Sequence, residues 1–208
     1  MLPSLPELDD ATRVLVQLSA AIAASDEATV RYWLTQAARD VPPAHVEELL
    51  LQSYLFCGFP RALNAAREWR RVSQRVAPDT DEAEDVGLAE EWRERGELTC
   101  AAVYGDMYEK LRLNVRDLHP ALDTWMVVDG YGKVLGRPGL DLQRRELCVV
   151  AACAAMGQDR QLHSHLRGAL NVGVEAGALG DTLDAIAGMI GAERARSAQL
   201  LLARVRGK

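Results

Sequence analysis

One acidic residue stands in an otherwise apolar helical stripe in the second half of the chain. Glu146, Val149, Val150 and Cys153 recur at spacings that place them on one face of a helix over residues 141–156. A carboxylate on such an apolar face could take part in acid–base catalysis. It could equally lie in the first turns of the helix, where the helix dipole favours a negative charge and water is within reach.

The next predicted helix, over residues 159–172, carries two histidines two positions apart. His163 and His165 flank its apolar face on opposite sides, because successive helical residues are about 100° apart. They cannot chelate one metal ion, since a metal-binding helix places its histidines at i and i+4, and we predict no metal site. His165 could donate or accept a proton, or it could be a hydrogen-bonded structural residue beside the core.

The two residues gain significance as a pair. Adjacent helices would bring Glu146 and His165 to the rim of one apolar seam. A carboxylate and an imidazole in such a seam are driven into different protonation states, which is how acid and base roles are assigned in active sites. We therefore predict Glu146 and His165 as the catalytic residues.

Length and composition favour a helical protein with a substantial core. The chain has 208 residues, 49% of them hydrophobic, enough for one large or two small domains. Alanine and leucine dominate, mostly at helical spacing, so we predict an all-α fold. The predicted helices cover residues 8–24, 27–39, 43–56, 62–76, 96–113, 119–128, 141–156, 159–172 and 177–202, the last broken near Gly191. We expect Asp26 to cap the second helix, Gly58-Phe59-Pro60 to separate the third from the fourth, and residues 130–139 to form a Gly/Pro-rich loop.

Charge and cysteine content narrow the function classes. A net charge of −6 gives no electrostatic basis for a nucleic-acid surface. No apolar run reaches the roughly 20 residues that a membrane span needs, so no membrane partner is expected. Four cysteines in a chain of this length indicate reduced thiols, and we predict a cytoplasmic protein.

Three stretches of the second half resemble the carboxymuconolactone decarboxylase family. They read GKVLGRPGLD at 132–141, RREL at 144–147 and LHSHLRGALNVG at 162–173, and VYGD at 103–106 extends the likeness. The resemblance runs from about Gly96 to Gly191, and residues 46–52 and 56–60 match the family more weakly. It implies an all-α, alkylhydroperoxidase D-like bundle that assembles into trimers or hexamers, or a dimer if the chain contains two repeats.

The resemblance also implies positions for the site residues. In the peroxidase relatives a glutamate, a C-x-x-C pair and a histidine form a relay. By position Glu146 corresponds to the glutamate and His165 to the histidine, whereas Gln158 and Gln161 stand in place of the cysteines. Glutamine can neither attack a peroxide nor form a disulfide, so thiol peroxidase chemistry is excluded at that site.

The two halves of the chain show weak similarity to each other. A shift of 132 residues aligns Arg13 with Arg145 and Leu34 with Leu166, which indicates a duplicated helical module. We predict a degenerate first repeat at 1–77, an acidic linker at 78–93 and a carboxymuconolactone decarboxylase-like domain at 94–208. The acidic stretch could instead be an interaction surface. Each copy lacks part of the family pattern, which fits either one composite site or loss of function in one copy.

Three functions follow from these residues. The first is cofactor-free decarboxylation of a small carboxylated lactone or keto acid, in which His165, oriented by Glu146, donates a proton and Arg137, Arg144 or Arg167 binds a carboxylate. The second is an alkylhydroperoxidase-type antioxidant activity using a displaced cysteine, for which Cys57 is the candidate. The third is a non-catalytic assembly module, which predicts a filled seam beside Glu146 and His165. We favour the first, acting as a homo-oligomer on a small-molecule substrate.

Overall fold

Helices form almost all regular structure in residues 4–207, which the computed structural model of the protein describes. Among these residues the single β-type pairing is an isolated bridge between Leu5 and Val174. The all-α prediction is therefore confirmed. The helices are α1 (Asp10–Ala24), α2 (Glu27–Asp40), α3 (Pro43–Ser73), α4 (Ala89–Tyr104), α5 (Tyr108–Leu118), α6 (Pro120–Trp125), a π-helical segment (Met126–Leu135), α7 (Leu142–Met156), α8 (Asp159–Asn171), α9 (Ala176–Ile190) and α10 (Ala192–Arg206).

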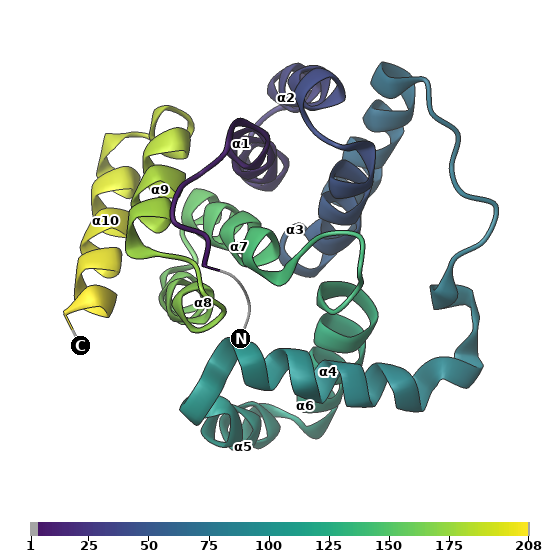
Figure 1. The fold of residues 1–208 in the computed structure, drawn as a ribbon, viewed down its shortest axis with the longest axis vertical. Helices are drawn as coiled ribbons and strands as arrows, with labels where there is room; N and C mark the ends of the chain where they lie inside the picture. Colours follow the sequence, from purple (N-terminus) through teal and green to yellow (C-terminus); the bar gives the residue numbers. More distant parts are fainter. Residues whose placement is uncertain (1–3, 208) are drawn as a thin grey trace.

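Helix α7 is the centre of the bundle. Figure 1 shows it with α1, α3, α8 and α9 around it, and α10 packed outside α9. Every residue from Arg145 to Ala155 is buried. Alanines occupy many of these positions, and their small side chains let the surrounding helices approach closely. The charged side chains in this buried stretch, Arg145 and Glu146, are thus held in the interior of the protein.

The predicted helix boundaries near the N-terminus agree with the structure. The Asp26 carboxylate accepts a hydrogen bond from the Thr29 amide at 2.9 Å, so the predicted cap of α2 is confirmed. The break near residue 58 is confirmed as well. Gly58 interrupts α3 with φ +77°, a conformation that favours glycine, and Pro60 lies in the first turn of the helix that follows.

The middle of the chain departs from the prediction in two places. Residues 96–113 form parts of two helices, α4 and α5, separated by a short 3₁₀ turn at 105–107. The loop predicted from residue 130 begins only after Leu135, because the chain first continues in π-helical turns.

Close packing explains Gly132, which suggested this loop, and its neighbour Gly96 of α4. A Cβ atom on Gly132 would lie 1.9 Å from the Trp92 carbonyl oxygen, and one on Gly96 would lie 2.1 Å from that of Val127. The glycines thus permit α4 to cross the π-helical segment in direct backbone contact, which no larger residue would allow.

Residues 74–88 connect α3 to α4 along the outside of the molecule (Figure 1). Three ion pairs hold the segment to the bundle: Asp81 pairs with Arg137 at 2.8 Å, and Glu82 pairs with Arg95 at 2.5 Å and with Arg137 at 3.8 Å. Helix α4 begins at Ala89, inside the predicted linker. The division into two repeats stays a prediction. None of the described helices combines the length and the apolar character that a membrane span requires.

Candidate active site

Glu146 and His165 are in direct contact between α7 and α8. The His165 Nδ1 atom lies 2.9 Å from Glu146 Oε2. Glu146 is fully buried, and His165 retains only 5% of its exposure. Gly157 ends α7 in the left-handed conformation at φ +68°, which turns the chain back so that α8 packs beside α7.

The space around the carboxylate depends on a glycine. A Cβ atom on Gly168 would lie 2.5 Å from Val103 Cγ1 and 2.9 Å from Glu146 Oε2. Glu146 Oε1 is buried and has no hydrogen-bond partner among the described residues. His165 is therefore the hydrogen-bond partner of this carboxylate among the described residues.

His165 stands between this carboxylate and a cavity. Because Nδ1 faces Glu146, Nε2 is the ring nitrogen left for a ligand. The rings of Phe56 and Tyr104 meet the imidazole edge-on, with centroids 5.7 Å and 6.5 Å from its own. These contacts hold the ring plane in place.

The cavity has a volume of about 610 Å³, and His165 contributes to its wall. Its lining comes from both halves of the chain, because Phe56 of α3 faces residues of α4, α5, α6, the π-helical segment and α8. We call it the aromatic cavity, since five of the chain's eleven aromatic residues line it. They are Tyr54, Phe56, Tyr104, Trp125 and Tyr131. Asp129 supplies the only carboxylate of this lining, and no lysine or arginine belongs to it.

Sequence reasoning missed these aromatic walls. The residues are scattered over 78 positions and share no motif. Two of them form a polar edge: burial raises the pKa of both Tyr104 and Tyr131, so both phenols stay protonated at neutral pH and can donate hydrogen bonds. The sequence offered one signal for these walls, namely that aromatic residues are scarce in this chain.

The three arginines predicted to bind a carboxylate lie outside the aromatic cavity. Arg137 pairs with Asp81 at 2.8 Å, and Arg144 pairs with Asp141 at 2.8 Å. Arg167 lines a different cavity, described below. The structure therefore brings Glu146 and His165 together without them, and their role in substrate binding stays a prediction.

The positions where the peroxidase relatives carry cysteines diverge in the structure. Gln161 lines the aromatic cavity, whereas Gln158 is exposed just before α8. All four cysteines are free thiols. Burial raises the pKa of Cys57 to about 11, and it raises that of the three other thiols to about 12. Such thiols carry very little thiolate at neutral pH, so nothing here favours peroxide chemistry.

A buried ion pair lies next to Glu146 in sequence and was also missed. The guanidinium of Arg145 is completely buried and donates to Glu48 of α3 at 2.8 Å. It also donates to the carbonyl oxygens of Leu140 and Arg137. This pair joins α3 to α7 but does not reach the aromatic cavity. Within the part of the chain that the structure describes, no cluster of three or more histidine, cysteine or acidic side chains is placed to hold a metal ion.

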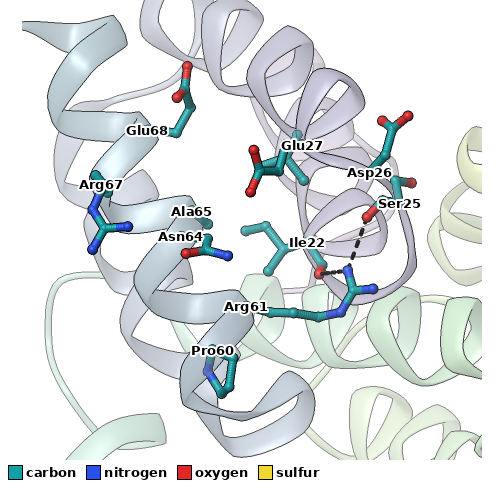
Figure 2. A pocket seen from close by; sticks show the side chains of 11 residues that line it. Ile22, Ser25, Asp26, Glu27, Pro60, Arg61, Asn64, Ala65, Arg67 and Glu68 are labelled. Carbon is teal, nitrogen blue, oxygen red and sulfur yellow. Dashed lines mark hydrogen bonds between the residues drawn. The ribbon is translucent and has the colours of Figure 1, made fainter.

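Another cavity, of about 530 Å³, lies between the α1–α2 corner and α3 (Figure 2). Figure 2 shows Arg61 reaching from α3 to the end of α1, where its Nη1 donates to the carbonyl oxygens of Ile22 and Ser25 at 2.9 Å and 3.1 Å. Arg61 thereby satisfies carbonyl groups that the helix leaves unpaired. None of the predicted site residues lines this cavity.

Comparisons with known proteins found a similar protein and a matching family model. Peroxisomal protein 2 of Schizosaccharomyces pombe (strain 972 / ATCC 24843) is 28% identical over 130 residues, which are 62% of this chain and 60% of the relative. The chain thus spans less than two thirds of that relative's length. Residues 122–204 match the sequence model of the Carboxymuconolactone decarboxylase family. The match contains both Glu146 and His165, and together with the all-α fold it agrees with the predicted resemblance: this segment is similar to the carboxymuconolactone decarboxylase family.

Proposed function

We propose that the Glu146–His165 pair catalyses cofactor-free decarboxylation of a small keto acid or carboxylated lactone in the aromatic cavity. The observation that carries this proposal is the 2.9 Å contact between a fully buried carboxylate and an imidazole that borders an otherwise largely apolar cavity. The family name of the matching segment points to the same reaction class.

The reaction needs a proton donor and a dry environment. As the bond between the carboxylate carbon and its neighbour breaks, CO₂ leaves and the electron pair stays on that neighbour, delocalised into the adjacent carbonyl. Protonated His165 gives its Nε2 proton to this carbon, and the Glu146 carboxylate stabilises the imidazolium until then. Solvent returns the proton after the product leaves.

The walls of the cavity support this chemistry. Aromatic and aliphatic side chains solvate a carboxylate poorly and neutral CO₂ well, so charge loss is favoured there. The phenols of Tyr104 and Tyr131 can donate hydrogen bonds to the enolate oxygen that forms. No guanidinium lines this cavity, and protonated His165 itself is the cation available to the departing group.

Release of CO₂ from a panel of keto acids and carboxylated lactones tests the proposal. We expect His165→Gln to lower kcat by about 10²–10⁴-fold, the usual contribution of a general acid. Glu146→Gln should cause a smaller loss, because the imidazole keeps a hydrogen-bond partner of the same size but loses the negative charge beside it. Circular dichroism verifies that both variants stay folded.

Arg160→Gln is the matched control, because Arg160 lies on the same helix, is exposed and lines neither the aromatic cavity nor the cavity of Arg167. It should turn over every substrate at the original rate. Equal activity in the original chain and in His165→Gln would falsify the proposal, as would the absence of CO₂ release from the whole panel.

The alternatives have weaker support. An antioxidant role needs a reactive thiol, and burial suppresses the thiolate form of all four cysteines. A non-catalytic assembly module predicted a filled seam, and an open cavity of about 610 Å³ adjoins His165 instead.

We further propose that the protein acts as a homo-oligomer. Helix α5 buries none of its residues within the described chain. Together with α6 it exposes several large apolar side chains, namely Leu113, Leu118, Leu122 and Trp125. Sedimentation equilibrium tests this, and a monomer at micromolar concentration contradicts it.

We also propose a cytoplasmic location for the protein, and subcellular fractionation tests it.

A further inference from the structure

A separate cavity of about 580 Å³ lies on the other side of α8, between that helix and the α4–α5 region. Arg167, half-buried on α8, contributes to its wall, and we call it the Arg167 cavity. Within residues 4–207 this guanidinium forms no hydrogen bond or ion pair with the protein. Arg137 and Arg144, in contrast, each bind two or more carboxylates.

A half-buried guanidinium without a partner is set up to bind an anion. It has lost part of its hydration, and its planar array of N–H groups matches a carboxylate or phosphate in bidentate fashion. The one acidic residue in the same lining is Asp106, which is exposed and forms no ion pair with Arg167. The positive charge of Arg167 is therefore available to a ligand.

The Arg167 cavity and the aromatic cavity adjoin. Tyr104, Leu111 and Ser164 line both of them. On α8, Ser164 lies between the two functional side chains: His165 projects about 100° to one side of it and Arg167 about 60° to the other. The two side chains are thus about 160° apart around α8, and on a helix with an outer diameter of about 10–12 Å this angle corresponds to roughly 15 Å along the surface that Ser164 occupies.

We propose that the Arg167 cavity binds the anionic group of an elongated organic ligand, a carboxylate or a phosphate, while the apolar body of the same ligand crosses Ser164 into the aromatic cavity. The second half of this inference rests on the proposed function, because it assigns the reacting end of the ligand to His165. The substrate would then carry an anionic group roughly 15 Å from its reacting carbon, in addition to the group that reacts.

Isothermal titration calorimetry with ω-phenylalkanoates tests the proposal. We expect affinity to peak near 10-phenyldecanoate, whose ring and carboxylate match this spacing, and to be at least 10-fold weaker for its neutral amide. Comparison with 9-phenylnonyl phosphate shows whether carboxylate or phosphate is preferred. Arg167→Gln should weaken binding of both anions about 10-fold or more without changing binding of the amide, and Trp125→Ala should weaken all three ligands.

The opposite charge and a matched arginine provide the controls. Asp106→Asn removes a repelling carboxylate from the Arg167 cavity and should tighten anion binding about twofold or more. Arg160→Gln, on an exposed part of α8, should leave every affinity within twofold. Equal losses in Arg167→Gln and Arg160→Gln would overturn the proposal, and so would equal binding of the acid and its amide.

His165→Gln separates this inference from the proposed function. It should abolish CO₂ release but retain the dependence of anion binding on Arg167. If the original chain shows that dependence without any turnover, the proposed reaction is wrong and the binding site stands. If turnover is found but anion affinity is indifferent to Arg167, the proposed reaction stands and the binding site is wrong.

Discussion

At the scale of single residues, the contact between Glu146 and His165 depends on the absence of a side chain at Gly168 as much as on the two residues themselves. We expect Gly168→Ala to destabilise the protein by about 1–3 kcal/mol, because its Cβ would overlap Val103 and press on the Glu146 carboxylate. It should also reduce activity by displacing Glu146 from His165. Thermal unfolding and CO₂ release measure the two effects.

Gly180→Ala is the matched control for this substitution. Nothing lies within 4 Å of a Cβ atom placed on Gly180, which is also helical. Alanine should therefore stabilise α9 by up to about 1 kcal/mol through its higher helix propensity. Loss of stability of equal size in both variants would contradict the packing argument at Gly168.

The thiol of Cys57 yields a second prediction at this scale. Burial raises its pKa to about 11, so alkylation by iodoacetamide at pH 8 should be about a hundredfold slower than that of a free cysteine. The rate should rise about tenfold for each pH unit until the pH approaches 11, because a raised pKa means that thiolate forms only there. Peptide mass spectrometry follows the modification at Cys57, and rapid alkylation or sulfenic acid formation at pH 7 would revive the antioxidant alternative.

At the scale of helices, the elements could be predicted from the sequence wherever local signals dominate. Helix α2 begins and ends close to its predicted bounds, because Asp26 caps it and its apolar residues recur at helical spacing. The π-helical segment could not be predicted, since Gly132 signals a loop unless the backbone of Trp92 is known to cross there. Only the distant chain segment reveals which meaning a glycine has.

The predicted site also has a part that local signals fix, Glu146 and His165, and a part that depends on distant segments, the arginines. Glu146 and His165 lie on consecutive helices, so their spacing and the short turn at Gly157 were sufficient to bring them together. The ion pairs of Arg137 and Arg144 involve partners up to 135 positions away, such as Asp9, and no local pattern indicates them. The aromatic cavity depends on six elements and was equally hidden.

Helices α3 and α7 are joined by the buried Glu48–Arg145 pair, which leads to a third prediction. Glu48→Gln should destabilise the protein by about 3–5 kcal/mol, because it leaves a completely buried guanidinium without its counter-charge. Urea denaturation measures the loss. The double variant Glu48→Gln/Arg145→Met should recover part of it by removing the unpaired charge, and a double variant less stable than the single one would contradict this account.

At the scale of the whole molecule, a long outer segment is held to the bundle by few contacts. Residues 74–88 are mostly exposed, and Asp81 and Glu82 supply their ion pairs to Arg137 and Arg95. Hydrogen bonds from Arg137 lower the pKa of Asp81, so this carboxylate stabilises the docked segment at neutral pH. That contribution is lost only as the pH falls through the lowered pKa of Asp81, below its ordinary value of 3.8.

The rate of cleavage by trypsin measures how firmly this segment is docked, because trypsin cleaves after arginine and Arg75 lies within the segment. Asp81→Asn should accelerate cleavage after Arg75 about two- to fivefold at pH 7, which corresponds to the roughly 0.5–1 kcal/mol that a partly exposed ion pair contributes. Asp79→Asn removes the same charge two residues away, where no ion pair exists, and should leave the rate unchanged. Equal acceleration by both substitutions would mean that net charge, rather than the contact between Asp81 and Arg137, determines how firmly the segment is docked.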